Sequence, residues 1–69
     1  MDEVTIRVKS KSLFWSEVEK VIKEIDNIYG VKAEYHMDYI HGTYWLLTGY
    51  KDGLKNLIAN GQKQYGFLN

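Results

Sequence analysis

The 69-residue sequence contains no cysteine and no proline. Disulfide bonds and thiolate chemistry are therefore excluded, and an intracellular, reducing setting fits this composition. No apolar run approaches the roughly 20 residues that a membrane span needs, and the acidic start Met1-Asp2-Glu3 differs from the basic start of a signal peptide. We therefore expect a soluble cytoplasmic protein that does not use a membrane.

The sequence also lacks a net charge, because nine basic residues balance nine acidic ones. A protein without a global positive field does not gather nucleic acid or an anionic lipid surface electrostatically. Four tyrosines and a tryptophan do fall within residues 32–51, but only Lys32 and Lys51 flank them. A single-stranded nucleic-acid platform interleaves basic residues with its aromatic ones. The composition therefore disfavours a nucleic-acid partner.

No motif of catalysis, metal binding or cofactor binding is present. Glu34, His36 and Asp38 alternate on one predicted strand, and His41 follows in a turn. Strand residues two apart are about 7 Å apart at Cα, so they chelate zinc only if their side chains lean together. No nucleophile, glycine-rich elbow or phosphate cradle accompanies them. We expect no enzyme activity, no catalytic residue, no metal and no cofactor, and a solvated sheet face at these positions.

What the sequence does contain is the pattern of one small α+β domain over residues 1–69. Alternating apolar residues predict a first strand at residues 3–9. Apolar residues at spacings of three and four then predict a helix that ends at Gly30. Ser16 with Glu19 fits a capping box at its start, with Ser12 as the alternative cap.

Two further strands at residues 32–40 and 43–51 are expected to meet in a two-residue turn at His41-Gly42. This register places Tyr35, Met37 and other apolar residues toward the helices. It leaves Trp45 and Leu47 on the outer face of the sheet. A slip of one residue would exchange the two faces.

A second helix is expected to begin at Asp52, which is a good N-cap, and to bury Leu54, Leu57 and Ile58. Its end is open between two alternatives. Asn60-Gly61 can stop the helix and leave residues 64–68 as a short last strand, or the helix can continue to Tyr65 and end at Gly66.

The resulting order, β-α-β-β-α with a possible final β, resembles the ferredoxin-like arrangement of split βαβ units, with an antiparallel sheet and both helices on one face. The resemblance covers topology along the whole chain and no motif. Heavy-metal-associated domains of this fold carry paired cysteines where this chain has Ser10-Lys11-Ser12. RNA-recognition modules place stacking aromatics where it has Thr5 and Arg7. Fold resemblance therefore indicates no function here.

The strongest functional expectation is a protein-binding or regulatory module that forms a homodimer. A chain this short gains stability from association, either through the outer sheet face or through a free strand edge. The alternative is a small-molecule sensor similar to ACT domains, which bind ligands between copies. The candidate partner-binding residues lie on the outer face, where Trp and Arg are typical interface anchors: Arg7, His36, Ile40, Trp45 and Leu47.

Overall fold

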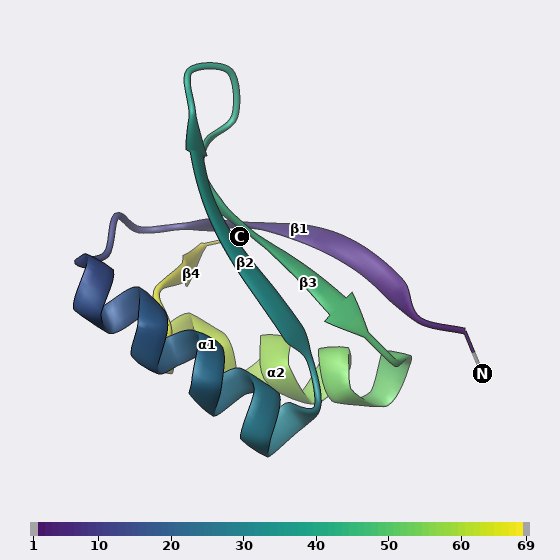
Figure 1. The fold of residues 1–69 in the computed structure, drawn as a ribbon. Coiled ribbons are helices and arrows are strands. Elements are labelled where there is room, and N and C mark those ends of the chain that lie inside the picture. The colour runs from purple at the N-terminus through teal and green to yellow at the C-terminus, as the bar shows by residue number, and fades with distance from the viewer. Residues whose placement is uncertain (1, 69) are drawn as a thin grey trace.

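The computed structural model describes residues 2–68, which form four antiparallel strands and two helices. The elements follow the order β1 (Val4–Ser10), α1 (Trp15–Tyr29), β2 (Lys32–Asp38), β3 (Gly42–Gly49), α2 (Lys51–Gln64) and β4 (Phe67–Leu68) (Figure 1). The strands are arranged in the sheet as β2-β3-β1-β4. The predicted α+β class and antiparallel sheet are therefore confirmed.

Both helices share one hydrophobic core with the sheet. Helix α1 contributes Val18, Val21 and Ile25 at the spacing of one helical stripe, and α2 contributes Leu54 and Leu57. The strands supply Ala33, Trp45, Leu47 and Phe67, and two buried residues lie outside the strands: Val31 directly before β2 and Tyr65 in the turn after α2. Within residues 2–68, no helix is long and apolar enough to cross a membrane.

The helix ends show which capping predictions hold. Gly30 closes α1 in the left-handed conformation, with a φ of 65°, as predicted. The predicted N-caps are wrong: Phe14 precedes α1 and Tyr50 precedes α2, and neither makes a side-chain capping bond. Serine 16 and Asp52 lie inside the first turns instead. Without a side-chain cap at either start, packing of the apolar stripes is the main source of stability for both helices.

The end of the chain combines features of the two predicted alternatives. Helix α2 continues through Gly61 to Gln64, and Tyr65 and Gly66 then turn the chain into β4. Gly61 is required at its position, because a Cβ there would lie 2.4 Å from ring atoms of Phe67. The missing side chain lets Phe67 lie directly on the helix.

The predicted register of the β2–β3 hairpin is wrong. The turn comprises Tyr39, Ile40 and His41, and Asp38 pairs with Gly42, whose φ is 71°. Tyr35 therefore pairs with Trp45, where the sequence predicted that it would face Thr48. The face predicted for β2 and β1 is correct, but the face of β3 is reversed.

Burial of Trp45 explains why this register is favoured. An indole left on the outer face would keep roughly 150–250 Å² of apolar surface in water, which costs about 4–6 kcal/mol at 25 cal/mol per Å². In the observed register Trp45 and Leu47 are both 0% exposed. The rings of Trp45 and Tyr35 meet edge-on with their centroids 4.9 Å apart. Nε1 of Trp45 donates a hydrogen bond to Ser10 Oγ at 3.2 Å.

Candidate interaction surfaces

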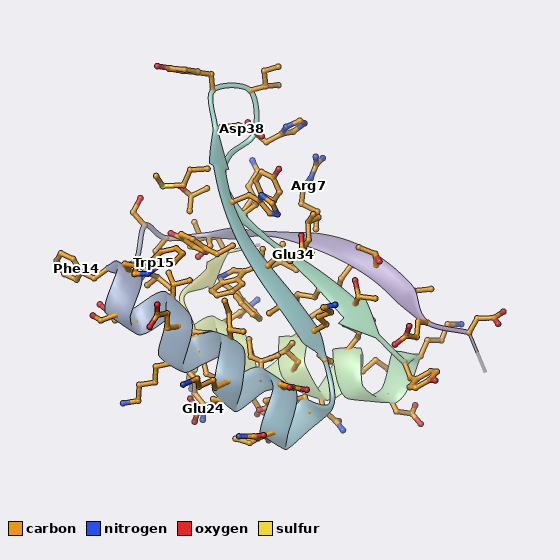
Figure 2. All side chains as sticks on the ribbon, viewed as in Figure 1. Arg7, Phe14, Trp15, Glu24, Glu34 and Asp38 are labelled. Atoms are coloured by element: carbon orange, nitrogen blue, oxygen red, sulfur yellow. The ribbon has the colours of Figure 1, made fainter. Side chains whose placement is uncertain are left out.

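The structure separates the five predicted partner-binding residues. Trp45 and Leu47 lie in the core, so the prediction that they stand on the outer face is wrong, and a partner cannot reach them while the fold is intact. Arg7 extends from β1 on the side of the sheet away from the helices (Figure 2). His36 shares that outer face, and Ile40 lies in the hairpin turn with 88% exposure.

Tyr44, on the outer face of β3, brings Arg7 and His36 together. The His36 ring stacks on Tyr44 with centroids 5.4 Å apart, and the Arg7 guanidinium lies 5.8 Å from the Tyr44 centroid. The predicted register, in which Tyr44 faces Tyr39, turned this ring toward the helices with the other apolar residues of the hairpin. The outer face is therefore held by ring and cation contacts rather than by an apolar patch.

Asp38 organises the hairpin turn. Its carboxylate accepts hydrogen bonds from the backbone N–H of His41 and from the Tyr44 hydroxyl, and it lies 3.3 Å from Nδ1 of His41. The backbone hydrogen bond from His41 is the main cause that lowers the pKa of Asp38. Partial desolvation and the nearby Asp38 charge raise the pKa of Tyr44. These contacts stabilise a three-residue turn that sequence patterns alone did not reveal.

The alternating polar residues of β2 do not form a metal site. His36 Nε2 lies 3.1 Å from Glu34 Oε1, while His41 and Asp38 form a separate pair. Among the described residues, no group of three or more histidine and acidic side chains is placed to hold a metal ion. The geometry gives Glu34, His36 and Asp38 structural contacts at the surface.

The edge of β2 is open. In the described part of the chain, the seven residues of β2 pair with β3 alone, so one row of backbone N–H and C=O groups faces outward. Natural proteins usually protect such an edge with proline, a bulge, a very short strand or charged side chains. Strand β2 is regular, of ordinary length and free of proline, so its charged residues Lys32, Glu34 and Asp38 are the one such device that it carries.

Large apolar side chains are exposed beside this edge. Met37 is 69% exposed at the end of β2, and Tyr39 and Ile40 are fully or largely exposed in the turn that follows. Figure 1 shows this hairpin end extending as an arm beyond the helices. Phe14 and Trp15, at the start of α1, are 79% and 70% exposed, and the Phe14 ring points away from the body (Figure 2). Exposed apolar groups of this size are typical of interaction surfaces.

Comparison with known proteins gives no assignment. No family model, no curated protein and no solved structure matches this chain.

Proposed function

We propose that this protein is a small non-enzymatic interaction module that forms a homodimer through the free edge of β2. The strand order and pairings fit the ferredoxin-like arrangement with both helices on one face, which leaves β2 at an edge. Pairing this edge with the same edge of a second copy would make one continuous eight-stranded antiparallel sheet. The observation that supports a second copy as the partner is the charge pattern of β2 itself.

The sequence of β2 is self-complementary about its central residue, Tyr35. Antiparallel pairing about a two-fold axis at Tyr35 places Glu34 opposite His36 of the second copy, and Lys32 opposite its Asp38. Lys32 therefore meets the opposite charge of Asp38, and the Glu34 carboxylate meets the His36 ring, which is charged only when it is protonated. On the other face, the small Ala33 lies opposite the large Met37. Cross-strand pairs of opposite charge stabilise a sheet, and like pairs destabilise it.

The exposed hairpin arm supports the same arrangement. In this register, Tyr39 and Ile40 of one copy continue past Lys32 of the other, toward its Val31 and the end of its α1. Aromatic residues cover roughly 150–250 Å² each when buried. A standard interface needs about 800 Å² from each partner. Two arms, with Met37 and the paired strands, supply surface of that order.

The experiment is sedimentation equilibrium of a charge-exchange series. Glu34→Lys places a lysine opposite His36, and His36→Glu places a glutamate opposite Glu34, each at two symmetric sites per dimer. At about 0.2–1 kcal/mol per cross-strand pair, a change at two symmetric pairs weakens the dimer by up to about 2 kcal/mol. His36→Glu should therefore raise the dissociation constant by up to about 30-fold, and Glu34→Lys should do the same at a pH where the His36 ring is protonated.

The double variant Glu34→Lys/His36→Glu restores opposite charges across the axis, so it should recover the dimer. Glu19→Lys makes the same charge change on the exposed side of α1 and serves as the control, for which we expect no effect. A wild-type protein that stays monomeric at millimolar concentration would contradict the proposal. So would a double variant no tighter than either single variant.

A further inference from the structure

The first half of β1 has a second open edge. On one side, β1 pairs with β3 along residues 4–9. On the other side, β4 pairs with Lys9 and Ser10 only, and Gly66 accepts one further bond from the Lys11 N–H. Within residues 2–68, the backbone of residues 4–8 therefore has no strand beside it on that side. A further strand could therefore pair with this part of β1.

The core is incompletely covered along this edge. Ile6 and Val8 face the helices, opposite the buried Leu47 and Trp45, yet both are only half-buried. Val4, on the same face, is 40% exposed. Ile58 is 37% exposed on α2, one helical turn before the Gly61 that Phe67 covers. A strand laid beside residues 4–8 would continue the line of β4 and bury these side chains.

The charge of β1 indicates a partner different from that of β2. Its outer face carries Thr5, Arg7 and Lys9, and neither Arg7 nor Lys9 has a carboxylate partner among the described side chains. Pairing of β1 with a second β1 would bring these cations toward each other, which is unfavourable. An incoming strand with acidic residues on its outer face would instead pair with them.

We propose that the β1 edge binds an extended segment of another protein in which acidic and apolar residues alternate. The backbone of the segment pairs with residues 4–8, as in other cases of strand addition to a sheet. Its apolar side chains cover Val4, Ile6 and Val8, and its acidic side chains lie beside Arg7 and Lys9. This site is separate from the β2 edge, and it does not depend on dimer formation.

The test uses three acetylated and amidated octapeptides. In the first, Glu and Val alternate; in the second, Lys and Val alternate; in the third, four Glu precede four Val. Binding is followed by amide chemical shifts and hydrogen exchange of the full chain. We expect the Glu-Val peptide to bind at least about tenfold more tightly than the other two. Protection should increase at those amides of residues 4–8 that point away from β3, and not at the amides of β2.

Two protein variants make the test decisive. Arg7→Glu/Lys9→Glu should reverse the preference, so that the Lys-Val peptide binds more tightly than the Glu-Val peptide. Glu34→Lys should leave peptide binding unchanged, because it alters only the β2 edge. Equal affinity for all three peptides, protection of β2 in place of β1, or an unchanged preference in the Arg7/Lys9 variant would overturn the proposal.

Discussion

The close packing of Phe67 on Gly61 predicts that Gly61→Ala destabilises the protein, although Gly→Ala within a helix usually stabilises it. In an exposed helix interior, Gly→Ala stabilises a protein by about 1 kcal/mol, because alanine has the higher helix propensity. At Gly61, the new Cβ would lie 2.4 Å from two ring atoms of Phe67. Phe67 is 3% exposed and contacts the rings of Trp45 and Tyr65, so it has little room to move. Overpacking of this kind costs about 1–3 kcal/mol.

We therefore expect Gly61→Ala to lower the free energy of unfolding, by up to about 2 kcal/mol after the gain in propensity is subtracted. Urea denaturation followed by tryptophan fluorescence measures the effect. The control is the same change in a Phe67→Val background, where the clashing ring atoms are gone. There, Gly61→Ala should stabilise the protein. A stabilising Gly61→Ala in the wild-type background would refute the close packing of α2 against β4.

Three further predictions concern the buried polar groups of Tyr65 and Ser10. Within residues 2–68, the enclosed Tyr65 hydroxyl has no partner in full hydrogen-bond geometry, although burial and the nearby Tyr29 both raise its pKa, so Tyr65→Phe should leave stability unchanged or raise it by up to about 1 kcal/mol in a denaturation assay at pH 7. Burial raises the pKa of Tyr65 to about 12. Because the pKa of Tyr65 is higher in the folded state than in the unfolded state, its contribution to stability is complete below about pH 10. The free energy of unfolding then falls as the pH rises toward 12, by at most about 1.4 kcal/mol per pH unit. A wild-type protein that loses no more stability than Tyr65→Phe in this range would contradict this prediction. Ser10→Ala leaves Trp45 Nε1 without an acceptor and should cost about 1–3 kcal/mol, whereas an unchanged melting temperature would indicate that another acceptor replaces Ser10 Oγ.

Sequence patterns predicted the order and type of the elements well, because hydrophobic periodicity is a local signal. The stripe that ends at Gly30 and the alternation of Val4, Ile6 and Val8 both correspond to observed elements. The helix starts were missed because their caps make no side-chain bond, so no local residue type marks them.

The candidate site was partly misplaced because the turn cannot be read from glycine alone. Gly42 does adopt a positive φ, but it closes a three-residue turn that depends on Asp38 accepting the His41 N–H. That contact shifts the pairing by an odd number of residues and brings Trp45 into the core. The burial energy of the Trp45 indole indicates the register more strongly than the position of the turn glycine does. The alternation of charge along β2 was visible in the sequence, but its importance follows only from the position of β2 at the sheet edge.

The most direct test of the proposed dimer is disulfide trapping, which the absence of native cysteine makes clean. In the proposed register, Lys32 lies directly opposite Asp38 of the second copy. Their Cα atoms are then separated by roughly 4.4–6.8 Å, the usual range across a disulfide bond. Two copies of Lys32 lie about 20 Å apart, six residues along the strand. Asp38→Cys removes the carboxylate that holds the turn, so tryptophan fluorescence must first show that Trp45 stays buried in this variant. A mixture of Lys32→Cys and Asp38→Cys proteins should then form a covalent heterodimer under mild oxidation, and each protein alone should not. No cross-link in the mixture, or equally fast cross-linking of either protein alone, would contradict pairing of β2 with itself.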